Sequence, residues 1–146
     1  SAVLSPRMVS DVVEAVASAR EAGTTVKMTG TGHSFTDIAA PEHALMVPNG
    51  LSGITEVDRD AMTVTALAGT PLKELNVSLE RLGLSLHNMG DIAEQTLAGA
   101  TSTGTHGSGG VAAGLAAQRL SGAAFSKSWS GGQIVTSTRG EPLPAL

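Results

Sequence analysis

The chain has 146 residues, a formal net charge of −4 at pH 7 and no cysteine. This length suits one domain with a core of its own. The negative charge argues against a broad nucleic-acid surface, the 2% aromatic content argues against base stacking, and the lack of cysteine excludes disulfides and thiolate metal sites.

A helix is predicted near the start of the chain. Ser5 can cap it, and Pro6 can occupy its first position, where the missing proline N–H costs nothing. Apolar residues then recur at helical spacing, and Gly23 is placed to end the helix. The apolar residues are Val9, Val12, Val13 and Val16.

Strands are predicted next. Residues 24–28 form a β-branched run, and the apolar run 44–47 leads into a turn at 48–50. Residues 54–57 and 62–68 predict a hairpin closed at 58–60, because apolar and polar residues alternate in its second arm.

A second helix is predicted after residue 70. Thr70 can cap it, Pro71 can take its first position, and Gly83 can end it. Its apolar stripe consists of Leu72, Leu75, Leu79 and Leu82. Residues 84–87 then predict a short strand. Alternating helices and strands without a fixed repeat indicate a mixed α/β or α+β domain.

The loop at 29–34 reads Thr-Gly-Thr-Gly-His-Ser and directly follows the predicted strand 24–28. Glycine lets backbone N–H groups approach an anion, because it has no Cβ and tolerates positive φ. His33 adds a nucleophilic imidazole nitrogen beside that site. The loop therefore predicts a phosphate cradle next to a reactive side chain, although taken alone it is also typical of a plain turn.

A second segment, residues 88–110, is rich in glycine, serine and threonine. Small or apolar residues at 97, 98 and 100 interrupt the polar ones and can pack, which flexible linkers lack. Its hydroxyls can bond to a polar ligand. The segment predicts a second wall of the same site.

The two segments resemble the paired flavin-binding signatures of the vanillyl-alcohol-oxidase type of FAD enzymes. Residues 32–39 read Gly-His-Ser-Phe-Thr-Asp-Ile-Ala, and residues 98–109 read Ala-Gly-Ala-Thr-Ser-Thr-Gly-Thr-His-Gly-Ser-Gly. The best match is the branch of sugar-1,4-lactone oxidases and dehydrogenases and alditol oxidases, over residues 3–118. The resemblance implies an α+β fold, a PCMH-type FAD-binding domain of two subdomains with mixed sheets flanked by helices.

The resemblance implies FAD as the cofactor, with the first loop holding its pyrophosphate and the second segment lining the rest. It also implies a covalent bond from His33 to the flavin 8α-methyl carbon; the alternative is that His33 only hydrogen-bonds within its loop beside non-covalent FAD. The cofactor-binding residues are Thr29, Gly30, Thr31, Gly32, His33, Ser34, Gly90, Thr96, Gly99, Ser102, Thr103, Gly104, Thr105 and His106.

The family's reaction is hydride transfer from a sugar lactone or polyol to flavin N5, with the substrate pocket and the base in a later domain. No catalytic residue and no metal ligand is therefore assigned, and the chain alone is expected not to turn over. The alternative is a non-catalytic or degenerate flavin- or nucleotide-binding module that needs a partner chain or a missing domain. We expect FAD and, through the missing domain, a sugar lactone or polyol as partners, no nucleic acid, no membrane span and a cytoplasmic location.

The end of the chain departs from the family. The domain is expected over residues 1–118, incomplete at its C-terminal end, with residues 119–146 as a divergent or irregular tail. Residues 119–132 are small and polar where an apolar strand should return to the sheet, so we expect an unpaired sheet edge. Residues 133–138 predict only a short strand.

Overall fold

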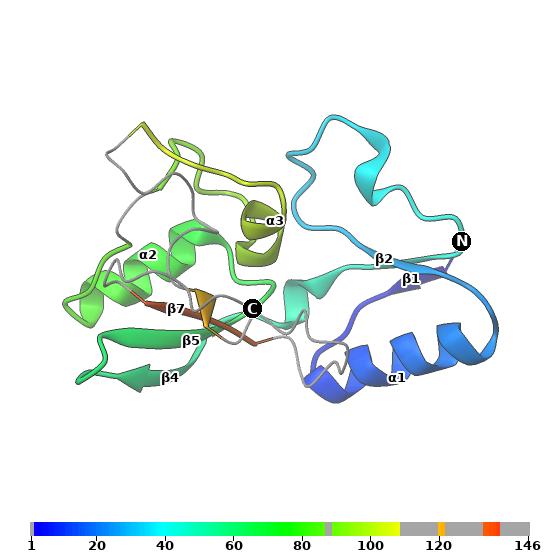
Figure 1. Cartoon of the computed structure of the whole chain (residues 1–146), viewed down its shortest axis with the longest axis horizontal. Helices are drawn as coiled ribbons and strands as arrows, with labels where there is room; N and C mark the ends of the chain where they lie inside the picture. Colours follow the sequence, from blue (N-terminus) through cyan, green and yellow to red (C-terminus); the bar gives the residue numbers. More distant parts are fainter. Residues whose placement is uncertain (1, 87–88, 109–119, 122–132, 138–146) are drawn as a thin grey trace.

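The computed structural model describes residues 2–86, 89–108, 120–121 and 133–137, which form two lobes (Figure 1). The first lobe holds a three-stranded parallel sheet in the order β1-β3-β2. Its elements are β1 (Ala2–Leu4), α1 (Val9–Glu21), β2 (Val26–Met28), the 3-10 turn η1 (Asp37–Ala39), β3 (Ala44–Met46) and the 3-10 turn η2 (Pro48–Gly50). Val12, Met46 and Leu51 form its buried core.

Helix α1 begins later than its Ser-Pro pattern predicts. The carboxylate of Asp11 accepts hydrogen bonds from the backbone N–H of Arg7 at 2.8 Å and of Met8 at 2.9 Å, so the helix starts at Val9. The prediction that Ser5 caps the helix and Pro6 starts it was wrong, because Asp11 supplies the cap. The same two hydrogen bonds lower the pKa of Asp11, and the bond from the Arg7 N–H has the larger effect.

The predicted face and end of α1 are partly confirmed. Val12 is buried and Val16 packs against the same core, but Val13 is 43% exposed and lies off the buried face. Gly23, at φ +63°, follows the helix in the left-handed region, as predicted.

The second lobe holds a four-stranded antiparallel sheet in the order β4-β5-β7-β6, and α2 covers one face of it (Figure 1). Its elements are β4 (Ile54–Asp58), β5 (Thr63–Leu67), α2 (Leu72–Arg81), α3 (Leu97–Ser102), β6 (Leu120–Ser121) and β7 (Gln133–Ser137). The predicted hairpin and the leucine stripe are confirmed, since Leu72, Leu75 and Leu79 are fully buried against Val64 and Ala66.

Three expectations for this lobe were wrong. Thr70 does not cap α2, because its hydroxyl donates to Leu67 O at 2.6 Å and accepts from Gly53 N at 2.9 Å, and the N-cap is Pro71. Residues 84–86 are irregular rather than a strand, and His87 lies outside the described residues. The edge of β5 is not left unpaired, because β7 pairs with it from Thr63 to Leu67; β7 itself confirms the predicted short strand.

The two lobes meet along the chain between η2 and α2. The Gly69 N–H donates to Leu51 O at 2.9 Å, and Leu67 packs against the core of the first lobe. One parallel and one antiparallel sheet, each with its own helices, confirm the α+β prediction. Within the described residues no helix combines the length and the apolar character that a bilayer crossing requires.

Candidate functional site

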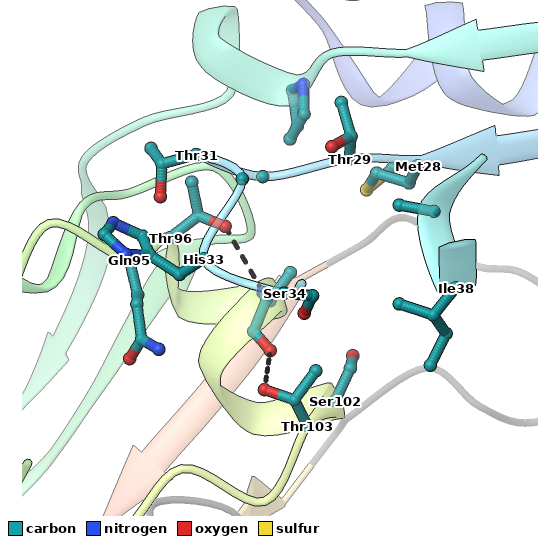
Figure 2. A pocket seen from close by; sticks show the side chains of 16 residues that line it. Met28, Thr29, Thr31, His33, Ser34, Ile38, Gln95, Thr96, Ser102 and Thr103 are labelled. Carbon is teal, nitrogen blue, oxygen red and sulfur yellow. Dashed lines mark hydrogen bonds between the residues drawn. The ribbon is translucent and has the colours of Figure 1, made fainter. Parts of the chain in front are cut away.

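A cavity of about 230 Å³ lies between the loop that follows β2 and helix α3 (Figure 2). The loop belongs to the first lobe and α3 to the second, so the site sits where the lobes face each other. The sequence-predicted residues that line it are Thr29, Gly30, Thr31, Gly32, His33, Ser34, Thr96, Gly99, Ser102 and Thr103. The two segments singled out in the sequence therefore meet and leave room between them.

The loop at 29–34 offers hydrogen-bond donors to the cavity. Thr29 N still belongs to the sheet, since it donates to Met46 O at 3.0 Å. From Gly30 to Ser34 no backbone N–H donates to an acceptor within the described part of the chain. Further along the chain the segment is tied back to β2, because Lys27 Nζ donates to Ile38 O at 3.1 Å. Such a row of unpaired N–H groups suits an anionic ligand.

The opposite wall is α3, a helix that the sequence analysis did not predict. Thr96 is its N-cap, with the hydroxyl accepting from Gly99 N at 3.3 Å, and Thr103 Oγ1 donates to Gly99 O at 2.9 Å (Figure 2). Leu97 and Ala100 are fully buried in the core of the second lobe. Core packing therefore holds the helix, and its polar face is left toward the cavity.

One hydrogen bond joins the two walls directly. Thr31 Oγ1 donates to Glu94 O at 3.0 Å, although the two residues are far apart in the sequence. The bond ties the first loop to the segment that precedes α3.

His33 lines the cavity and is half-buried. Its ring has no hydrogen-bonding partner among the described residues, so the structure does not show the loop-internal bond that was the alternative role.

The remaining predicted residues, Gly90, Gly104, Thr105 and His106, do not line the cavity. They cluster past the end of α3, where a Cβ at Gly90 would lie 3.1 Å from His106 O and Thr105 N donates to Ala100 O at 3.1 Å. His106 is exposed, and its Nδ1 lies 3.2 Å from Gly107 O. The role of these four residues in binding FAD stays a prediction.

Other cavity residues were missed in the sequence. Gln95 is the most informative, because its Oε1 is buried without a hydrogen-bond partner among the described residues, and such a group is costly unless a ligand or water bonds to it. Its position directly before the cap residue Thr96 is the one signal that could have pointed to it. The missed lining residues are Met28, Ile38, Ala39, Pro48, Gln95 and Ala98. No group of three His, Asp or Glu side chains in the described residues could hold a metal ion.

Comparison with known proteins identifies the family and its cofactor. The sequence matches the FAD binding domain family over residues 1–137. The chain belongs to this family. FAD is therefore its cofactor, and the α+β fold with two lobes is that of a PCMH-type FAD-binding domain. The family match extends past the boundary expected at residue 118, which itself stays a prediction.

Curated relatives of this FAD-binding domain are named for sugar lactones. It is 37% identical over 109 residues to L-gulono-1,4-lactone dehydrogenase of Mycobacterium tuberculosis, covering 75% of this chain and 26% of that protein. It is 38% identical over 104 residues to L-gulonolactone oxidase of Scyliorhinus torazame, covering 71% and 24%. The chain thus spans about a quarter of the length of these relatives.

A solved structure supports the fold. Cholesterol oxidase from B. sterolicum superimposes with a TM-score of 0.64 at 25% identity, over 72% of this chain and 21% of that one.

Proposed function

We propose that this chain is the FAD-binding portion of an oxidoreductase that oxidises a sugar lactone or polyol, and that the cavity between the lobes binds the FAD pyrophosphate. The observation that carries the proposal is the loop from Gly30 to Ser34, which lines the cavity opposite α3 and whose backbone N–H groups have no acceptor among the described residues. The names of the relatives support the lactone class, and a polyol is the alternative substrate.

The cavity fits one part of FAD. At about 230 Å³ it is below the roughly 300–1,000 Å³ of pockets that enclose a whole ligand, so the rest of the cofactor would extend outside it. The unpaired N–H groups suit the acceptor-only diphosphate, and hydroxyls of Thr29, Ser34 and Ser102 add further donors. The unpaired Gln95 Oε1 suits a donor of the cofactor, such as a sugar hydroxyl.

The bound FAD supplies a hydride acceptor, and this chain's own residues hold and orient it. The loop at 29–34 binds the negative charge of the pyrophosphate, and α3 contacts the cofactor from the opposite side of the cavity. We assign no base to the chain, and we place the substrate pocket in a part of the protein beyond these residues. We also propose a cytoplasmic location, supported only by the absence of cysteine.

We further propose that His33 carries a covalent bond to the flavin 8α-methyl carbon. The new N–C bond replaces the ring N–H and one methyl C–H, the two electrons and two protons released reduce the flavin itself, and an electron acceptor such as dioxygen reoxidises it. The support is that its ring lines the cavity and has no partner among the described residues. The test is acid precipitation of the FAD-loaded protein as wild type, His33→Ala and His43→Ala, the last being an exposed histidine that does not line the cavity. Yellow pellets are expected for the wild type and His43→Ala and a colourless one for His33→Ala. Release of all the yellow colour from the wild type would contradict the link.

The function itself is tested by two measurements. The purified chain should show flavin absorption bands, and the longer protein that contains it should reduce an artificial dye with L-gulono-1,4-lactone or xylitol. The chain alone should bind FAD without turnover. Flavin bands with no turnover by the longer protein would favour the alternative, a non-catalytic flavin-binding module.

A further inference from the structure

Thr96 occupies a fixed position at the junction of α2 and α3. It is 2% exposed and forms an antiparallel bridge with Pro71. The backbone on both sides is tied to the start of α2, since Leu72 N donates to Gln95 O at 2.9 Å and Leu97 N donates to Thr70 O at 2.8 Å. Thr96 therefore cannot shift without disturbing the second lobe.

The side chain of Thr96 faces Gly30 of the opposite lobe. A Cβ built on Gly30 would lie 2.5 Å from Thr96 Oγ1, a separation that real Cβ atoms essentially never show. The same hydroxyl accepts the capping bond from Gly99 N (Figure 2). The Thr96 hydroxyl is thus held by a hydrogen bond from α3, and it limits how closely the loop at 29–34 can approach that helix.

Position 30 requires glycine because of this contact and not because of its backbone conformation. Its φ lies outside the left-handed region, so an alanine could adopt its conformation. Gly32, two residues on, is the reverse case, with φ +79° and no atom within 4 Å of a built Cβ. The neighbouring bond from Thr31 Oγ1 to Glu94 O holds the loop against this contact.

We propose that Thr96 is a positioning residue that sets, through Gly30, the distance between the phosphate-binding loop and α3, and so the affinity for FAD. The inference rests on the proposed role of the cavity in FAD binding. Contact at Oγ1 stops the loop from approaching further, and the Thr31 bond stops it from retreating. The width of the cavity then depends on two threonine side chains, Thr96 and Thr31.

The test is a double-mutant cycle read by FAD titration and by thermal unfolding of the FAD-free chain. Gly30→Ala should weaken FAD binding by about tenfold or more, because the new methyl overlaps Oγ1 and pushes the loop outward. In a Thr96→Ala background the nearest remaining atom is Cβ at 3.6 Å, an ordinary contact, so Gly30→Ala should cost little further affinity there.

Two control variants separate spacing from capping. Thr96→Val loses the cap but keeps an atom where Oγ1 was, so it should lower the melting temperature and should not rescue Gly30→Ala. Gly32→Ala is strained by its φ, so Thr96→Ala should not rescue it either. If Gly30→Ala fails to fold, the same comparison is made by circular dichroism, where folding restored by Thr96→Ala supports the proposal and an unfolded double variant overturns it.

The outcomes distinguish this inference from the function beneath it. A wild-type chain that binds no FAD would overturn both. A wild type that binds FAD, with additive effects of Gly30→Ala and Thr96→Ala, would leave the proposed function standing and overturn the positioning role.

Discussion

Substitution of Gly69 by alanine should weaken the junction between the lobes. Gly69 is buried, and a Cβ there would overlap Pro48 O and would lie 2.8 Å from Leu51 O. Both obstacles are backbone atoms, so no side-chain rotation relieves the overlap. Overpacking costs typically about 1–3 kcal/mol, and we expect the upper end here, about 3 kcal/mol of unfolding free energy. For a chain of this size that corresponds to a melting temperature lower by about 6–12 °C.

The assay is urea or thermal unfolding of Gly69→Ala beside the matched variant Gly23→Ala. Gly23 has no atom within 4 Å of a built Cβ and only its φ of +63° resists alanine, so we expect a loss of about 1 kcal/mol there. Because Pro48 also lines the cavity, Gly69→Ala should weaken FAD binding while Gly23→Ala should not. Equal stabilities of the two variants, or unchanged FAD affinity in Gly69→Ala, would refute the reasoning.

Two further substitutions test the folding of each lobe. Leu75→Ala should cost about 2–5 kcal/mol, because the side chain is fully buried, whereas Val77→Ala, 47% exposed on the same helix, should change stability by no more than about 0.5 kcal/mol; equal losses in urea unfolding would contradict the assigned face. Asp11→Ala should destabilise the chain most at neutral pH. The lowered pKa of Asp11 means that its carboxylate contributes stability above its unfolded pKa of about 3.9, and this contribution is lost as the pH falls through the folded pKa. Unfolding measured from pH 7 to pH 2 should show the difference narrowing, and a constant difference would count against the cap.

Local signals in the sequence predict much of this fold. The leucine stripe of α2, the hairpin β4–β5 and the glycine that ends α1 depend on residues close together in the chain, and all three are confirmed. Strand β1 (Ala2–Leu4) gave no such signal, since it is three residues long and is defined by pairing with the distant β3. Helix α3 was missed because threonine and glycine disfavour helix, and burial of Leu97 and Ala100 together with the Thr96 cap holds it.

The two wrong helix starts share one sequence pattern. Ser5 and Thr70 each precede a proline, the usual pattern of a cap followed by a first helical residue. A cap works only if its side chain is free for the first turn. The Thr70 hydroxyl is taken by Leu67 O and Gly53 N, and at the other helix Asp11 provides the acceptor instead. Sequence spacing cannot show which partner a hydroxyl takes when the competitor comes from another strand.

The two glycines of the loop show the same limit of prediction from sequence more clearly. Gly30 and Gly32 are indistinguishable in the motif, yet the first is required by a neighbouring side chain and the second by its own backbone angle. Asparagine, which tolerates the left-handed region, should therefore be accepted at Gly32 and rejected at Gly30. A motif records that small residues are needed and not why. The reason at Gly30 lies in Thr96 on the other lobe, which is why the width of the cofactor cavity is a property of how the lobes pack and not of either loop alone.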